Sequence, residues 1–421
     1  MCAAPGSTNS PSSLTLTRRS LIGLAVLLLL PWGVLWWSWS RAHLPKTKEP
    51  THSSETAPRP SRVGPWGELI TTRMVIEPPE MLIGTPSAAR VPAVWTFPGY
   101  TAERLEDLWS RAQLTPSQLT ELNDRANRWE SVNGTLIVRP SDELVLSLSP
   151  ESRAVIYSAL AEFPENPNQQ EPYRFRADVA EEWFQKSEVR PEIIELVKRL
   201  LYRRGTSLLF SDINLVLPHL SSLNERVQLV KTLARKSTLL VKIRLSDTSD
   251  IDQLERYWGH GQRARDIRPI LQSLARQGRG AMLDIIHLLP RVPRSLLYTY
   301  PTIDDAGNGS FLDCHWSVLN FFKLAPDDRY QDLDLVREAF MRDYYPIFGK
   351  PTFGDLVLFT RKGDEVIHSC VYIADDIVFT KNGAHASAPW ILMELSDVIA
   401  FYPSNEPLDI QYIRSRGGSN D

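Results

Sequence analysis

Residues Phe311–Phe322, with the sequence FLDCHWSVLNFF, carry the strongest structural signal in this chain. The segment contains Cys314, one of three cysteines among 421 residues. A turn-rich stretch, 304–310, precedes it, and Trp316 and Leu319 follow at helical spacing. The pattern predicts that Cys314 lies in the first turn of a buried helix. There, unpaired backbone N–H groups and the helix dipole stabilise a thiolate.

A histidine suited to act as the base for this thiolate lies further along the chain. Residues 353–373 predict two strands joined by the turn 361–364, and His368 lies inside the second, otherwise apolar strand. The pair Asp375-Asp376 then predicts a hairpin turn, and residues 377–383 a return strand. A thiol and an imidazole on neighbouring elements indicate nucleophilic catalysis.

Three short motifs in this region occur in a recognisable order. They read DCH at 313–315, GDLVLF at 354–359 and HSCVYI at 368–373. In order and spacing they resemble the motifs of the NlpC/P60 peptidases, over residues 295–403. The resemblance implies a papain-like domain at 291–403, with a helix packed on a small antiparallel β-barrel or sheet. It also implies a cysteine peptidase or amidase without cofactor or metal, acting on a peptide of the bacterial cell wall (peptidoglycan).

The resemblance further implies roles for individual side chains. Cys314 is the expected nucleophile and His368 its base. The expected third catalytic residue is Asn382, because an amide oxygen can accept the Nδ1–H of an imidazole and hold its tautomer. Three neighbours are alternatives for that role: Thr380, Lys381 and His385. Four residues are expected to line the substrate site: Asp313, Tyr298, Tyr300 and Trp316.

The chain departs from the family pattern next to the expected nucleophile. His315-Trp316 stands where a Ser-Gly pair is usual, and Cys370 stands where a glycine is usual. Because the bulky pair fills space that a substrate would use, an inactive module that binds wall peptides or partners is an alternative. A buried structural thiol is another. A disulfide between Cys314 and Cys370 is a third. A fourth is a structural zinc site made of soft ligands: Cys314, His315, His368 and Cys370.

The N-terminal part predicts a membrane segment. A polar head, residues 1–19, ends in Arg18-Arg19, and an apolar, tryptophan-rich run at 20–40 is just long enough to cross a bilayer. We expect an uncleaved signal-anchor there, with a cleaved signal peptide as the alternative. Residues 41–65 predict a disordered proline-rich linker. The expected location is therefore a single-pass membrane protein whose C-terminal domains lie outside the cytoplasm, in the periplasmic or extracytoplasmic space.

Composition limits the partners and the number of domains. The net charge is −3 and the pI about 6.3, so the chain has no overall positive electrostatic field that would attract nucleic acid. Nucleic acid is therefore not expected as a partner. The length predicts two or more domains. The oligomeric state is left open by the sequence.

Residues 66–290 show no pattern that indicates chemistry. Residues 66–175 predict an α/β domain, with helices at 103–112, 114–122 and 149–160 and strands at 134–139 and 143–148. Residues 176–290 predict a mainly helical domain with one strand, 239–245, and helices at 191–203, 224–235, 251–258, 267–276 and 281–289. A tail, 404–421, carries little signal. The predicted fold class is thus α+β: an N-terminal transmembrane helix, a mainly helical middle region and a C-terminal papain-like domain.

Overall fold

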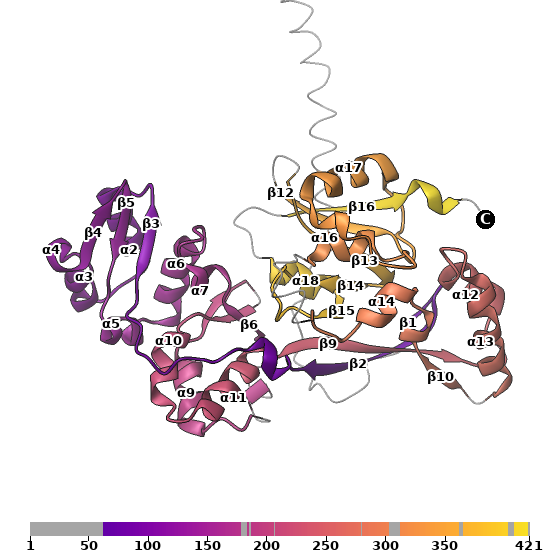
Figure 1. Ribbon diagram of the computed structural model, residues 1–421, viewed down its shortest axis with the longest axis horizontal. Helices are drawn as coiled ribbons and strands as arrows, with labels where there is room; N and C mark the ends of the chain where they lie inside the picture. Colours follow the sequence, from indigo (N-terminus) through magenta and orange to yellow (C-terminus); the bar gives the residue numbers. More distant parts are fainter. Residues whose placement is uncertain are drawn as a thin grey trace, which may run out of the picture. The chain divides into compact units, whose positions relative to one another are not determined.

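The computed structural model describes residues 62–419, except for 178–182, 185–186, 206, 279, 303–311, 362–364 and 403–407. The described residues form an α+β fold with sheets of six, four, three and three strands (Figure 1). Within these sheets, the paired strands run antiparallel.

The six-stranded sheet contains the candidate site. Its strand order is β11-β16-β12-β13-β14-β15. The strands are β11 (Tyr344–Ile347), β12 (Leu356–Arg361), β13 (Glu365–Ala374), β14 (Ile377–Lys381), β15 (Trp390–Glu394) and β16 (Asp409–Ser415). The hairpin and return strand expected from the sequence correspond to β12, β13 and β14.

The two faces of this sheet pack against different helices. On one face, Leu358, Val371 and Phe379 share a core with α16 (Cys314–Leu319) and α17 (Leu333–Asp343). On the other face, Val357, Cys370 and Val378 pack against α18 (Leu395–Phe401) through Val398. Successive side chains along a strand point to opposite faces of the sheet. Neighbouring residues of one strand therefore pack against different helices, one against α16 and α17 and the next against α18.

The turn before β12 is fixed against the end of α16. Gly354 has φ +91°, and a Cβ at this position would lie 2.5 Å from the Phe322 ring, so only glycine fits. The adjacent Asp355 carboxylate accepts two hydrogen bonds from Arg414, at 2.8 and 2.7 Å, and one from the Thr352 N–H. This turn therefore sets the position of β12 relative to α16.

A four-stranded sheet lies beside the site. Its order is β1-β2-β9-β10, with β1 (Arg62–Gly64), β2 (Gly67–Ile76), β9 (Lys236–Leu245) and β10 (Ala281–Asp284). Strands β2 and β9 pair from Glu68↔Arg244 to Ile76↔Lys236. The Thr238 hydroxyl of β9 donates to the Leu392 carbonyl at 3.0 Å and accepts the Leu392 N–H at 3.2 Å. These two bonds attach β9 to β15 of the six-stranded sheet.

The remaining elements form two small sheets and several helices. The sheets are β3 (Trp95–Pro98), β5 (Thr135–Val138) and β4 (Trp129–Val132), and β6 (Tyr173–Arg176), β8 (Ser207–Phe210) and β7 (Tyr202–Arg204). The helices before β9 are α2 (Ala102–Arg111), α3 (Pro116–Leu122), α4 (Arg125–Arg128), α5 (Asp142–Ser147), α6 (Pro150–Leu160), α7 (Pro167–Gln170), α9 (Pro191–Arg199), α10 (Ile213–Val216) and α11 (Leu223–Ala234). After β9 come α12 (Ile251–Trp258), α13 (Ala264–Arg276) and α14 (Arg291–Leu296). Short 3-10 helices occur at Glu80–Leu82, Leu217–His219, Ile285–Leu288, Asp328–Gln331 and Arg416–Ser419.

The predicted fold class, with its transmembrane helix, is wrong for the part of the chain that the structure describes. None of the helices there is both long and apolar enough to cross a bilayer. The predicted span, 20–40, and the predicted linker up to residue 61 lie outside the described residues.

The middle region, 176–290, contains the helices α9 to α13, but it also contains strands that the sequence did not predict. Residues 176–290 contribute β7, β8, β9 and β10, and the helix expected at 281–289 is instead β10 followed by a 3-10 helix. The segment Ala281–Asp284 pairs with Leu245–Lys242 of β9, because the exposed edge of β9 offers backbone groups that need partners. The strand expected at 143–148 is also incorrect, because Ser141 caps a helix there by accepting the Leu144 N–H.

Candidate active site

Cys314 is the first residue of α16. Asp313 is the N-cap, and its carboxylate accepts the Trp316 N–H at 2.8 Å, while the Ser317 hydroxyl donates to the Asp313 carbonyl at 2.6 Å. The Cys314 side chain is buried, with 6% of its surface exposed. The thiol therefore lies beside the first backbone N–H groups of a capped helix.

The ladder between β13 and β14 stops close to this thiol. Its last pair is Val371↔Phe379, although β13 stays paired with β12 as far as Glu365, and β14 stays paired with β15 as far as Lys381. A side-chain bond replaces the missing backbone bonds: His368 Nε2 lies 2.9 Å from Thr380 Oγ1. The two strands are therefore joined here through an imidazole.

The hydrogen bonds around Thr380 define the tautomer of His368. The Thr380 hydroxyl donates to Asn382 Oδ1 at 3.0 Å, so its oxygen must accept from His368 Nε2–H. Asn382 is held in turn by Met393 of β15, whose sulfur accepts the Asn382 amide N–H at 3.1 Å. In a neutral imidazole with Nε2 protonated, Nδ1 carries the lone pair. Asn382 thus acts on His368 through Thr380 rather than directly.

Nδ1 of His368 is a buried polar atom without a hydrogen-bond partner among the described residues. The whole His368 side chain is enclosed, with 0% exposed surface. Its ring stacks on Tyr402 at 4.4 Å between centroids and meets the edge of Phe359 at 5.2 Å. Buried polar atoms are nearly always paired, so this unpaired ring nitrogen marks His368 as a candidate for a chemical role.

The residue of β13 that faces α16 is Ser369, not His368. His368 packs with Phe359 and Tyr402 on the α18 face, whereas Ser369 Oγ lies 2.9 Å from Nδ1 of His315 on α16. Among the described residues, no hydrogen bond joins Cys314 to His368. No catalytic role was expected for His315 or Ser369 from the sequence. Ser369 lies two residues before Val371, in the part of β13 that pairs regularly with β12, so the alternation of the strand places both on the α16 face.

Cys314 and Cys370 are free thiols, so the alternative disulfide is not formed in this structure. Cys370 is fully buried two residues beyond His368 on β13. Burial raises the pKa of the Cys370 thiol well above its ordinary value, and the nearby Cys314 raises it further. Cys370 therefore stays protonated at neutral pH and is a poor nucleophile.

Lys381 lies on the α16 face of β14, since Phe379, two residues earlier, packs in that core. Its ammonium donates to the Gly383 carbonyl at 2.8 Å and to the His385 carbonyl at 3.2 Å. Burial lowers the pKa of Lys381 to about 8, against the opposing charges of Cys314 and Asp313. A buried, partly deprotonated lysine is thus close to the candidate nucleophile.

Lys381→Met is expected to stabilise the fold at pH 7 by about 2 kcal/mol. Lowering a lysine pKa to about 8 corresponds to about 3 kcal/mol, of which lost hydrogen bonds offset about 1 kcal/mol. The folded-state pKa is depressed, so the stability associated with the neutral amine is complete above the unfolded-state pKa and is lost as the pH falls through about 8. Urea unfolding at pH 7 and at about pH 10.5 measures the effect, which should shrink at the higher pH. A variant that is less stable than wild type at pH 7 contradicts this reading.

The remaining residues predicted for the site, Trp316, Tyr298, Tyr300 and His385, do not all lie together. Trp316 is buried against Trp390, with 6.2 Å between ring centroids, and its indole N–H donates to Asp328. Tyr298 and Tyr300 line a cavity of about 880 Å³ together with Met81 and Leu82.

Tyr298, in the wall of this cavity, has φ +64°, and its hydroxyl donates a hydrogen bond to the Leu239 carbonyl.

His385 is exposed, and its Nδ1 forms a hydrogen bond with the Ser387 hydroxyl, so the structure does not bring His385 to His368. The structure thus brings Asp313, Cys314 and Lys381 near one another and joins His368 to Thr380 and Asn382.

Comparison with known protein families, with characterised proteins and with solved structures finds no match to this chain.

Proposed function

We propose that Cys314 is the nucleophile of a thiol hydrolase that cleaves an amide bond, with His368 as its base. The observation that carries the proposal is the buried, unpaired Nδ1 of His368, whose tautomer is set through Thr380. An imidazole oriented through one nitrogen and left basic at the other is the arrangement that a thiol nucleophile needs. The position of Cys314 at the capped start of α16 supports the same reading.

In the proposed reaction, the His368 ring has to approach the Cys314 thiol, to which it makes no hydrogen bond in the described part of the chain. His368 Nδ1 takes the proton from the Cys314 thiol, and the sulfur attacks the carbonyl carbon of the amide. In this proposal, the Cys314 backbone N–H at the start of α16 stabilises the oxyanion. The C–N bond then breaks, and the leaving amine takes the proton from Nδ1. Water finally hydrolyses the thioester, and the carboxylic acid product leaves with a regenerated thiol.

The substrate class rests on the resemblance to NlpC/P60 peptidases. A peptide amide of the bacterial cell wall is the substrate we propose. The burial of the site favours a second candidate: with Cys314 6% exposed and His368 fully enclosed, a substrate carbonyl has little access to the sulfur. A module that binds wall peptides without cleaving them is therefore the competing function.

Iodoacetamide is expected to alkylate Cys314 in the folded chain even at about pH 6, where ordinary thiols are almost unreactive. Mass spectrometry of the labelled peptide measures the rate at each pH. Cys314→Ser should abolish this labelling, and Cys370→Ala should leave it unchanged because Cys370 is fully buried. Labelling that begins only in alkaline solution, or only after unfolding, would reject the hydrolase and leave the binding module.

A further inference from the structure

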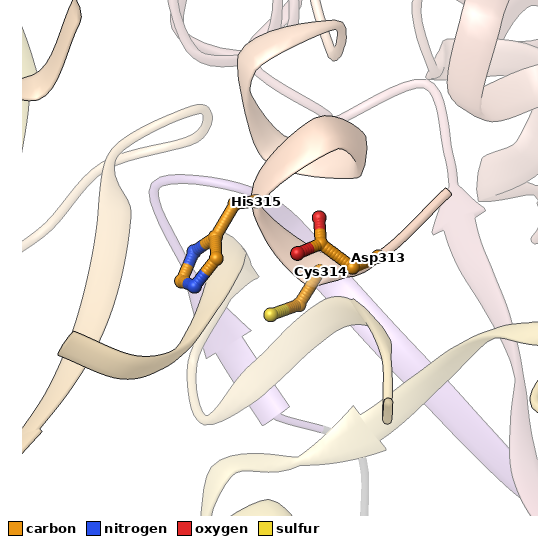
Figure 2. Close-up of side chains that lie close together, drawn as sticks. All are labelled: Asp313, Cys314 and His315. Atoms are coloured by element: carbon orange, nitrogen blue, oxygen red, sulfur yellow. The ribbon is translucent and has the colours of Figure 1, made fainter. Parts of the chain in front are cut away.

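Three potential metal ligands converge at the start of α16. A carboxylate oxygen of Asp313, the sulfur of Cys314 and a ring nitrogen of His315 all lie within 4.8 Å of one another. Figure 2 shows the three side chains projecting to the same side of the chain, with the sulfur next to the imidazole. They supply one oxygen, one sulfur and one nitrogen donor.

Two of these ligands are already oriented by neighbouring groups. Nδ1 of His315 bonds to Ser369 Oγ at 2.9 Å, which leaves Nε2 as the nitrogen for a metal ion. Metal-binding histidines usually have such a partner on the other nitrogen, because it fixes the ring and its tautomer. One oxygen of Asp313 accepts the Trp316 N–H at 2.8 Å, and a carboxylate retains further lone pairs for a cation.

The donor set defines the class of ion. Thiolate, imidazole and carboxylate together suit Zn²⁺, and three protein ligands leave the fourth tetrahedral position for water. A thiolate and a carboxylate bring two negative charges, which match a divalent cation. The main opposing charge is the ammonium of Lys381, which lies close enough to respond to both Asp313 and Cys314.

We propose that Asp313, Cys314 and His315 form a binding site for one Zn²⁺ ion. This set differs from the zinc alternative drawn from the sequence, which joined Cys314 and His315 to His368 and Cys370. Zn²⁺ at this site holds the sulfur of the candidate nucleophile. It therefore inhibits the hydrolase, a consequence that rests on the proposed function, whereas metal binding itself does not.

The test is titration of the full, metal-free chain with Zn²⁺ against a chromophoric zinc chelator, and with Co²⁺ followed by its thiolate absorption band. We expect one ion per chain. Asp313→Asn keeps a helix cap of equal quality while removing the charged ligand, and should weaken Zn²⁺ binding more than about tenfold. His315→Gln should weaken it similarly. Cys314→Ser should remove the Co²⁺–thiolate band, and Cys370→Ala should preserve it.

Two results would overturn the site: no binding by the folded wild type, or binding that Asp313→Asn and His315→Gln leave unchanged. A band that disappears in Cys370→Ala but survives in Cys314→Ser would also overturn it, because the thiolate ligand would then be the wrong one. Alkylation of Cys314 in metal-free protein tests the hydrolase separately. The two proposals therefore fail by different measurements.

Discussion

His368→Gln is expected to slow the alkylation of Cys314 at neutral pH by about tenfold, because the thiol loses the base that accepts its proton. With a cleavable peptide amide, the same change is expected to lower the hydrolysis rate by about 10² to 10⁴, the usual contribution of general base catalysis. Glutamine can still bond to Thr380, so the link between β13 and β14 is preserved while the basic nitrogen is removed. Iodoacetamide labelling followed by mass spectrometry measures the first effect, and steady-state kinetics the second.

Two control variants separate the base from its surroundings. Phe359→Leu disturbs the packing against the His368 ring without removing a titratable group, and should leave the labelling rate within about twofold of wild type. His315→Gln removes the other imidazole near Cys314. If His315→Gln slows labelling and His368→Gln does not, the base is His315, held by Ser369, and the assignment of His368 is wrong.

Arg153→Met is expected to destabilise the fold by about 3 to 5 kcal/mol. Arg153 has 0% exposed surface; its guanidinium donates to Asp212 Oδ2 at 3.0 Å and to the Leu148 and Val145 carbonyls. Asp212 also accepts the Tyr157 hydroxyl at 2.5 Å. Removing the arginine leaves a buried carboxylate with one hydrogen bond and no opposite charge. Urea unfolding at pH 7 measures the loss.

The pH dependence of this loss has a defined sign. Burial raises the pKa of Asp212, while the charge of Arg153 and the Tyr157 hydrogen bond oppose the rise. A carboxyl with a raised folded-state pKa contributes stability that is complete below the unfolded-state pKa and is lost as the pH rises through the folded-state value. Without Arg153 the pKa of Asp212 rises further, so the variant should lose less stability at about pH 5 than at pH 7.

The matched control is the double variant Arg153→Met, Asp212→Leu. Replacing both charges by apolar side chains removes the unpaired carboxylate, so much of the stability should return. If the double variant is no more stable than Arg153→Met, the damage comes from altered packing or from the unsatisfied Leu148 and Val145 carbonyls, not from the buried charge.

Short-range signals predicted many individual elements. Thr115 caps α3, with Pro116 at the first helical position and Gln118 completing a capping box, and Ser149 caps α6. The position of Cys314 at the start of a helix followed from the turn before it and the apolar spacing after it. These features depend on residues within one or two helical turns of one another, so their physical causes are present in the local sequence.

Long-range pairing decided what local patterns could not. Strands β2 and β9 lie far apart in the chain yet pair from end to end, and β10 completes their sheet in place of the helix expected at 281–289. The periodicity of Ala281–Asp284 is too short to distinguish strand from helix. The exposed edge of β9 selects the strand because its backbone groups need partners.

The sequence by itself determined the helix that begins at Cys314 and the strands β12 to β14. It also placed His315 on that helix and His368 on β13. Only the tertiary structure decided which face of β13 each side chain occupies. It set Ser369 toward α16 and His368 toward Tyr402, and it ended the β13–β14 ladder so that His368 bonds to Thr380. The physical reason is that a shift of one residue in strand register exchanges the two faces, and that register is set by pairing with distant segments.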